Sequence, residues 1–244
     1  MVHVVDHVFV LLLVLVQPVH GAAAFRRYHA HIVAGHAANR RRLYTETLAL
    51  EWLALAGLVL AWMMLERPAA SLGLIVPHGG GFWISACVVL ILAAFLVRSL
   101  RSARCMTEFE KAGHRGSLGE LVHFLPRTDR EFRHFVGLSI TAGIVEELVY
   151  RGFLLWYLSV HAPLWVAVLL SSVAFGPAHS YQGISGFVRT GLAGFAFAIL
   201  YVASGSIWLP IIAHAMIDIL QGAMILEIFR RDRGTATSRD APTG

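Results

Sequence analysis

The sequence predicts an all-α membrane protein, a polytopic bundle of about seven transmembrane helices. Hydrophobic residues make up 57% of the chain and charged residues 14%, whereas a soluble domain is usually about one-quarter charged. Mean hydropathy is +0.66. Apolar runs of about 18 residues or more recur along the chain, and such runs are long enough to cross a bilayer as helices. They lack the alternation of barrel strands, so a helical bundle is expected.

The first apolar run ends just before a basic segment. The run covers 2–19, and Ala22–Ala24 resembles the cleavage site of a signal peptide. Arg26 and Arg27 follow at once, and basic residues directly after an apolar segment resist translocation. We therefore expect a retained first helix with its N-terminus outside.

Six further spans follow in order. They are expected at 46–65, 82–98, about 135–158, about 163–180, about 184–203 and about 206–229. The polar, basic stretch 99–134 is expected to form an interfacial amphipathic helix, and it would add an eighth span if it crossed the membrane. Residues 1–130 thus form N-terminal helices and basic loops, 131–229 a catalytic helical core, and 230–244 a polar cytoplasmic tail.

Basic residues test this topology. Loop 22–43 contains five arginines, loop 99–134 contains seven Lys plus Arg, and the tail from 230 contains four arginines. The alternate loops, 66–81, 159–163 and 204–206, contain a single basic residue among them, Arg67. Seven spans with the N-terminus outside place every basic loop in the cytoplasm, as the positive-inside rule requires. This distribution indicates a multi-pass protein of a bacterial-type plasma membrane, and it gives no indication of nucleic-acid binding. Cys87 and Cys105 suggest neither a disulfide framework nor a metal motif.

The stretch GIVEELVYRGFLL places three ionisable side chains inside the fourth span. Such residues are costly at membrane depth and usually mark function. On a helix, Glu147 and Arg151 are four residues apart and can form an ion pair. Glu146 points about 100° away from Glu147. The pattern predicts one neutralised pair and one carboxylate that is free for chemistry, although a purely structural ion cluster is an alternative.

Two later spans supply further polar groups. Phe175 and His179 stand at i and i+4 around Gly176-Pro177, and the proline is expected to break the helix near His179. In the last span, His214 and Asp218 share one face. Lipid cannot solvate these groups, so they should converge on each other or on a wet cavity.

Two histidines and a carboxylate indicate hydrolytic chemistry. Glu146, His179 and His214 form the His₂Glu ligand set of catalytic zinc. The same three residues could instead hold a water directly, with Glu146 as the general base. Both alternatives give an activated water, and peptide hydrolysis in the membrane is the natural reaction.

The motifs EELVYRG, FGPAH and HAMID resemble the EExxxR, FxxxH and HxxxN/D motifs of the CPBP family. This family, also called Abi, comprises CAAX-processing and bacteriocin-processing intramembrane proteases, including the Ras-converting CAAX endopeptidase. The resemblance covers about residues 130–228. It implies a membrane-embedded or lipidated peptide as substrate and a divalent metal such as zinc as a candidate cofactor.

The resemblance also implies roles for the motif residues. Glu146 would activate the water, and His179 would be its partner in binding the water or a metal. His214 and Asp218 would stabilise the oxyanion. Glu147, Arg151 and Phe175 would be structural residues near the site. Asp218 stands where the family has Asn or Asp, and an ionised Asp cannot donate to an oxyanion. It would therefore be protonated, orient His214 or bind metal.

The predicted spans create one difficulty. Glu146 lies about eleven residues from the cytoplasmic start of its span, whereas His179 lies near the cytoplasmic end of the next span. At about 1.5 Å per residue, the two depths differ by roughly 15 Å. Two single acids, Asp6 and Glu51, lie near span ends and are expected to extend toward the membrane surface.

The sequence also bears on functions other than that of a CPBP-type protease. Gly183-Ile184-Ser185-Gly186 resembles a rhomboid motif, with Ser185 and His214 as a dyad, but a helix-capping role for Ser185 is simpler. No HExxH motif of a site-2-type protease occurs. A catalytically silent scaffold or immunity protein of the same fold remains an alternative. A transporter is not favoured, because the ionisable residues lie in one half of the chain.

Overall fold

The computed structural model describes residues 1–36, 39–180 and 183–230 of the 244-residue chain, and all regular secondary structure in this part is helical. The α-helices are α1 (Val4–Leu11), α2 (Gln17–Val33), α3 (Arg40–Met64), α4 (Gly80–Arg104), α5 (Glu108–Ser117), α6 (Asp129–Glu147), α7 (Leu155–His161), α8 (Leu164–Ala178), α9 (Gly183–Ser204) and α10 (Trp208–Phe229). Two π-helical segments, η1 (Leu12–Val16) and η4 (Leu148–Leu154), continue the helices before them. Two short 3₁₀ segments are η2 (Ala69–Leu72) and η3 (Gly119–His123).

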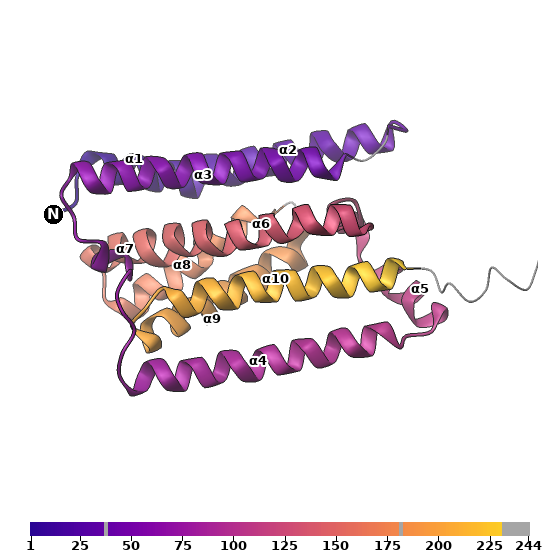
Figure 1. Cartoon of the computed structure of the whole chain (residues 1–244). Helices are drawn as coiled ribbons and strands as arrows, with labels where there is room; N and C mark the ends of the chain where they lie inside the picture. Colours follow the sequence, from indigo (N-terminus) through magenta and orange to yellow (C-terminus); the bar gives the residue numbers. More distant parts are fainter. Residues whose placement is uncertain (37–38, 181–182, 231–244) are drawn as a thin grey trace, which may run out of the picture.

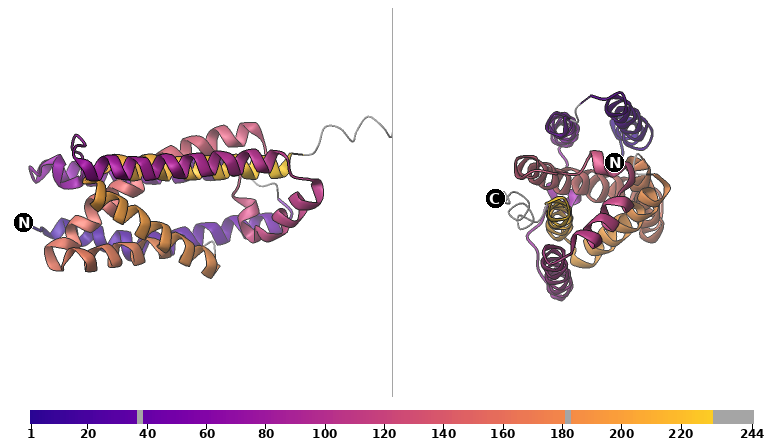
Figure 2. Two further views of the ribbon diagram at one scale, coloured as in Figure 1. Left: turned by 90° about the horizontal axis from the view of Figure 1, so that it is seen from below. Right: turned by 90° about the vertical axis from the view of Figure 1, so that its right-hand side faces the viewer.

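The long helices run along a common axis (Figure 1). The α1–α3 layer covers one side of the bundle, α6 and α10 lie in the middle, and α4 lies on the opposite side. The end-on view of Figure 2 shows the same arrangement around α10. α6 contacts α10 and α3, α8 packs against α9, and α10 also contacts α4. The middle helices α6 and α10 contain Glu146, His214 and Asp218, and His179 follows the end of α8.

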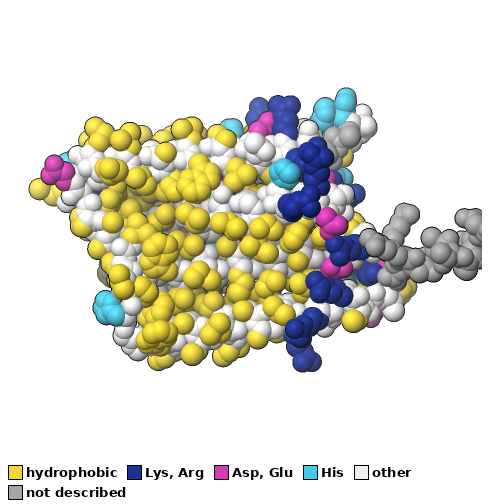
Figure 3. Space-filling view, viewed as in Figure 1, with side chains coloured by type: hydrophobic (Ala, Val, Ile, Leu, Met, Phe, Trp, Pro, Cys, Tyr) yellow, Lys and Arg dark blue, Asp and Glu magenta, His cyan; other side chains and the backbone are white. Residues whose placement is uncertain are grey.

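Five helical runs are long and apolar enough to cross a membrane. They are Val4–Val33, Arg40–Met64, Gly80–Arg104, Gly183–Ser204 and Trp208–Phe229. Apolar side chains cover the flank of the molecule (Figure 3), as expected of a surface in contact with lipid tails. The chain is therefore a polytopic helical membrane protein.

Two predicted spans fall outside that set of five. The run from Asp129 to His161 is helical throughout as α6, η4 and α7, but it is more polar than the others. α8 is an apolar helix of 15 residues. At about 1.5 Å per residue it is roughly 22 Å long, shorter than the apolar core of a bilayer.

The predicted difference in depth between Glu146 and His179 was wrong, because α8 is short. Glu146 lies fifteen residues before the end of α7 at His161, and His179 lies fifteen residues after the start of α8 at Leu164. Measured from the turn between these helices, the two side chains are therefore at similar depth. The predicted depth difference depends on a fifth span that reaches the cytoplasmic surface, whereas α8 ends at the depth of Glu146.

The predicted end of the first helix was also wrong. Helix runs without interruption from Val4 to Val33, through the alanines that resemble a cleavage site. Alanine is the strongest helix former, so this small-residue stretch extends the helix. The basic pair Arg26-Arg27 lies in the last turns of α2 instead of in a loop.

Charged residues gather at the ends of the bundle. Lysine and arginine side chains cluster at the end where α10 finishes (Figure 3). At the opposite end, Arg67 binds Asp6 through two hydrogen bonds of 2.7 Å. Asp6 lies near the end of the bundle, as expected, but it is only 3% exposed, so its side chain is enclosed by protein. The guanidinium of Arg67 also stacks on Trp62 and Trp156, which encloses the pair and fastens α1 to the rest of the fold.

Helix α5 occupies part of the stretch expected to be interfacial. Arg115 donates to the backbone carbonyl of Ile228 at 2.8 Å, and Lys111 donates to that of Arg230 at 3.4 Å. Cations at a helix C-terminus satisfy its free carbonyls and its dipole. Hydrogen bonds from Arg115 and Lys111 also lower the pKa of Glu108 below its ordinary value. α5 thus closes the C-terminal end of α10.

Gly143 allows α6 and α10 to approach closely. A Cβ atom at this position would lie 2.9 Å from the carbonyl oxygen of Ile211 and 3.0 Å from the Cβ of Ala215. Real Cβ atoms essentially never approach another atom below 3.0 Å. Because Glu146 and His214 lie on these two helices, the contact at Gly143 sets the distance between them.

We expect Gly143→Ala to lower the apparent melting temperature, because its Cβ would push α6 and α10 apart. Gly137 lies on the same helix, and a Cβ there would meet nothing within 4 Å. Gly137→Ala should therefore be neutral or stabilising, by up to about 1 kcal/mol from helix propensity. Thermal unfolding of the two variants in detergent measures the difference. Equal melting temperatures would contradict the close approach.

Candidate active site

A buried ion pair lies at the centre of the site. Glu147 and Arg151 are 0% and 1% exposed, and Arg151 Nη1 donates to Glu147 Oε1 at 2.9 Å. The sequence spacing predicted this pair. Arg151 lies in η4, where the helix widens to π geometry, and π segments occur frequently at functional sites.

Arg151 also connects the pair to two other helices. Its Nη2 atom donates to the carbonyl oxygen of Gly194 on α9 at 3.0 Å. Its guanidinium lies 4.4 Å from the ring centre of Phe175 on α8. A Cβ at Gly194 would lie 2.9 Å from Phe175 and 3.1 Å from Arg151. One guanidinium thus holds η4, α8 and α9 together, with a glycine providing the space.

His214 on α10 is fixed by the same pair. Its Nδ1 atom lies 2.8 Å from Glu147 Oε1. An ionised carboxylate only accepts hydrogen bonds, so Nδ1 carries a proton and Nε2 faces the site. The ring is stacked on Phe197, with centroids 5.0 Å apart and planes at 13°. A carboxylate partner on one nitrogen orients an imidazole and sets its tautomer. This contact gives Glu147 a positioning role that the sequence did not indicate.

Glu146 points to the other side of the helix, toward both imidazoles. Its Oε2 atom lies 3.9 Å from His214 Nε2 and 4.0 Å from His179 Nε2. Asp218 Oδ2 lies 3.7 Å from His214 Nε2. The structure therefore brings together Glu146, His179, His214 and Asp218, the four predicted catalytic residues, from three separate helical runs. Their catalytic roles stay predictions.

The distances around Glu146 are characteristic of a hydrated site. Separations of 3.7–4.0 Å exceed a hydrogen bond, and they are short enough for one water to hydrogen-bond to both groups at about 2.8 Å. Glu146 Oε2 is shielded from solvent and has no hydrogen-bond partner among the described residues. A buried carboxylate oxygen needs such a partner. The arrangement suits a water held between Glu146 and the imidazoles.

The His and Glu donor atoms are of the kind that binds zinc, but the distances between them are longer than a zinc site requires. A tetrahedral zinc ion with bonds of about 2.0–2.1 Å places its ligand atoms roughly 3.3–3.4 Å apart. The separations from Glu146 to the two histidines are about 0.5 Å larger, and within the described ranges no group of three His, Cys, Asp or Glu side chains is spaced to hold a metal. The metal assignment to Glu146, His179 and His214 stays a prediction.

His179 lies at the end of α8, where the sequence predicted a break. The helix ends at Ala178, one residue after Pro177. His179 Nδ1 lies 3.3 Å from the carbonyl oxygen of Phe175, and the two rings are 5.0 Å apart. Phe175 is 2% exposed and packs between His179 and Arg151. It therefore lies beside the site, as predicted.

Two polar residues near the site were missed or misread from the sequence. Glu51 on α3 was expected at the membrane surface, but its Oε2 atom is buried and unpartnered, and its charge interacts with those of Glu146, His214 and Asp218. Tyr150 is 3% exposed, and its hydroxyl also lacks a hydrogen-bond partner among the described residues. The sequence signal for Glu51 was its place in an otherwise apolar helical stripe.

The serine-protease alternative gains no support from the structure. Ser185 is exposed near the start of α9. Both ring nitrogens of His214 face carboxylates, those of Glu147, Glu146 and Asp218. In the part of the chain that the structure describes, no hydrogen bond joins Ser185 to His214.

Comparison with known proteins agrees with the motifs. Residues 129–220 match the sequence model of the family described as Type II CAAX prenyl endopeptidase Rce1-like. A curated relative, "Putative membrane peptidase YdiL" of Bacillus subtilis (strain 168), is 35% identical over 92 residues. That alignment spans 38% of this chain and 37% of the relative. No solved structure gives a significant match. The resemblance to the CAAX-processing (CPBP) family is thereby confirmed for residues 129–220, which contain all the predicted site residues.

We expect Arg151→Met to destabilise the protein by about 3–5 kcal/mol, because it leaves the buried Glu147 carboxylate without its guanidinium partner. Arg42→Met is the matched control, since Arg42 forms an exposed pair with Glu46 on α3, and such solvent-screened pairs contribute little to stability. Membrane accumulation and thermal unfolding of both variants measure the effect. Normal accumulation and an unchanged melting temperature for Arg151→Met would contradict the central role of the pair.

Proposed function

We propose that the chain is an intramembrane endopeptidase that hydrolyses a peptide bond in a membrane-associated substrate with a water activated by Glu146. The observation that supports this most strongly is the unpartnered Glu146 Oε2 atom, 3.9–4.0 Å from the Nε2 atoms of two histidines on other helices. A general base must lie within reach of the proton that it removes, directly or through one water. The family match over residues 129–220 supports the same chemistry.

The proposed reaction begins with the water between Glu146 and His179. Glu146 removes a proton while the water oxygen forms a bond to the carbonyl carbon of the peptide. The carbonyl oxygen becomes an oxyanion. When the carbon–nitrogen bond breaks, the proton on Glu146 passes to the leaving amine. His179 orients the water throughout.

His214 and Asp218 are proposed to stabilise the oxyanion. In its imidazolium form, His214 donates from Nε2, while Glu147 accepts from Nδ1 at 2.8 Å and balances the charge. Asp218 donates only when protonated. Because α10 holds both residues and Gly143 sets its distance from α6, these donors are preorganised relative to Glu146.

The proposed substrate is a membrane-embedded or lipidated peptide, prenylated or bacteriocin-like, in the plasma membrane. In this proposal the chain has seven membrane segments with the N-terminus outside: the five long apolar runs are joined by the helical run Asp129–His161 and by α8, which enters the membrane and ends at the depth of the site. The clustering of lysine and arginine at the end where α10 finishes (Figure 3) supports this orientation.

Substitution of the proposed base should abolish cleavage and leave the fold intact. We expect Glu146→Gln and His179→Ala to reduce kcat/KM by at least about 10²–10⁴, with unchanged membrane accumulation and melting temperature. The assay is cleavage of a farnesylated fluorogenic peptide ending in a CAAX-type sequence, alongside a screen of unmodified peptides. Glu46→Gln, at an exposed site on α3, is the control. Full activity of Glu146→Gln would contradict the mechanism. Function in cells that survives Glu146→Gln would support the silent scaffold or immunity protein.

The metal prediction has its own test. If Glu146, His179 and His214 bind zinc, purified protein should contain about one equivalent, and His179→Ala should lose it. Elemental analysis of both proteins, with chelator treatment before the cleavage assay, measures this. A metal content well below one equivalent together with chelator-resistant activity would instead support the water held directly by Glu146 and His179.

A further inference from the structure

Glu51 interrupts an apolar stripe on α3. The stripe has the alternating spacing of four and three residues that packs one helix along another. Its members are Tyr44, Leu48, Glu51, Leu55, Leu58 and Trp62. The other five are buried or partly buried in hydrophobic clusters. A carboxylate thus occupies a position in this stripe at which an apolar side chain would be expected.

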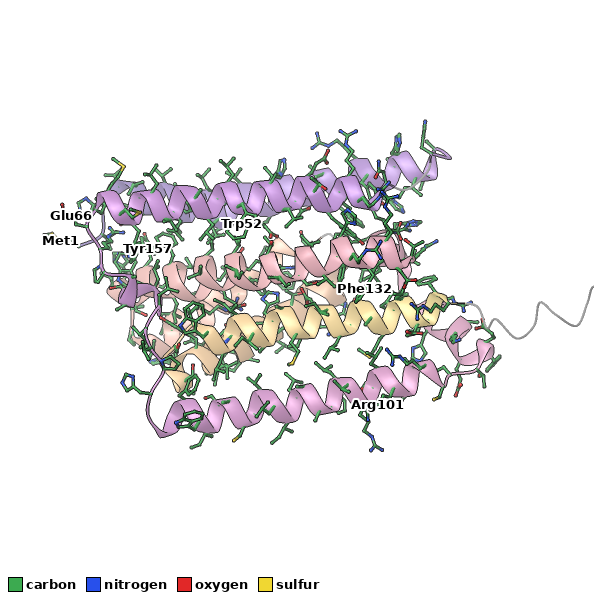
Figure 4. All side chains as sticks on the ribbon, viewed as in Figure 1. Met1, Trp52, Glu66, Arg101, Phe132 and Tyr157 are labelled. Atoms are coloured by element: carbon green, nitrogen blue, oxygen red, sulfur yellow. The ribbon has the colours of Figure 1, made fainter. Side chains whose placement is uncertain are left out.

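The stripe places Glu51 about one helical turn from the level of Glu146. On one side of Glu51, Tyr44 packs with Leu138 of α6, and on the other side Leu55 packs in the cluster that contains Val145. Next to Glu51, Trp52 donates to the hydroxyl of Thr141 at 3.2 Å. Figure 4 shows Trp52 about midway along the bundle. Glu51 therefore faces α6 deep inside the molecule, one helical turn or so from the catalytic carboxylate.

Two unpartnered carboxylate oxygens lie in this part of the bundle. The Oε2 atoms of Glu51 and Glu146 are both shielded from solvent, and neither has a hydrogen-bond partner in the described residues. Burial acts most strongly on the Glu51 carboxyl, and the charged groups of Glu146, His214 and Asp218 also act on it. A buried polar group without a hydrogen-bond partner destabilises the fold. Residues that break a local rule at such a cost are expected at functional sites.

A peptide substrate would supply the missing hydrogen-bond donor. Inside a membrane, the backbone N–H groups of an extended peptide have no water to bind and must be satisfied by protein. We propose that Glu51 is a substrate-binding residue that accepts a hydrogen bond from a backbone N–H beside the scissile bond. This places the carbonyl carbon against the water on Glu146. The inference rests on the proposed peptidase function, and Glu51 lies outside the matched residues 129–220.

A structural role for Glu51 and a binding role predict opposite results for Glu51→Leu. If Glu51 serves only the fold, its removal should destabilise the protein. If it serves the substrate, leucine completes the apolar stripe and should raise the apparent melting temperature by about 2–4 °C. The same variant should lower kcat/KM by at least about tenfold, mainly through KM, because an N–H of the bound peptide loses its acceptor.

Glu51→Gln is the companion variant, since its amide oxygen still accepts a hydrogen bond. It should retain kcat/KM within about threefold of wild type. Glu46→Leu, an exposed acid on the same helix, is the control and should change neither KM nor kcat. An unchanged KM for Glu51→Leu, or equal losses for Glu51→Gln and Glu51→Leu, would overturn the assignment.

A series of peptides methylated on single backbone nitrogens tests the hydrogen bond itself. At one position next to the scissile bond, methylation should weaken binding to wild type by at least about fivefold and leave binding to Glu51→Leu unchanged, because both changes remove the same bond. Additive effects at every position would overturn the proposal. Binding of the farnesylated fluorescent peptide is measured in the Glu146→Gln background, where no cleavage is expected. This binding assay tests whether Glu51 contacts the peptide. The cleavage assay tests the peptidase chemistry, so failure of one proposal can be distinguished from failure of the other.

Discussion

The buried ion pair between Glu147 and Arg151 is the interaction on which the site depends. Its two charges lie fully inside an apolar bundle, and either charge alone would be costly there. Beyond the ion pair, Arg151 donates to the carbonyl of Gly194, and Glu147 accepts from Nδ1 of His214. α9 and α10 are thereby tied to η4. The orientation of His214 thus follows from the same contact that neutralises the two charges.

Two adjacent glutamates serve different purposes because the helix points them in different directions. Glu147 is directed into the packed core, where its Oε1 atom accepts from both Arg151 and His214, whereas Glu146 is 19% exposed and faces two imidazoles at non-bonding distance. The first carboxylate is held by a direct ion pair, and the second has no direct partner and is available to act as a base. In the proposed enzyme, Glu51 adds a third, unsatisfied carboxylate from α3, and peptide binding would satisfy its free oxygen.

The spacing of residues along the sequence predicted much of the site. It did not predict how deep each residue lies in the membrane. The separation of four residues predicted the Glu147–Arg151 pair, and the motifs on separate spans predicted which residues meet. The sequence could not show that α8 ends after 15 residues, which places His179 level with Glu146. It could not show the contact from Glu147 to His214, because that depends on the packing of α6 against α10. Glu51 was misread because its position was judged by distance from a span end and not by the stripe that it shares with Leu55.

A high-resolution experimental structure of the protein in lipid would test the central claim most directly, through the density between Glu146, His179 and His214. We expect one ordered water within about 2.6–3.2 Å of Glu146 Oε2 and His179 Nε2, with His214 Nδ1 still bonded to Glu147. A packed apolar side chain in this space, or a direct hydrogen bond from Glu146 to another protein group, would contradict the account.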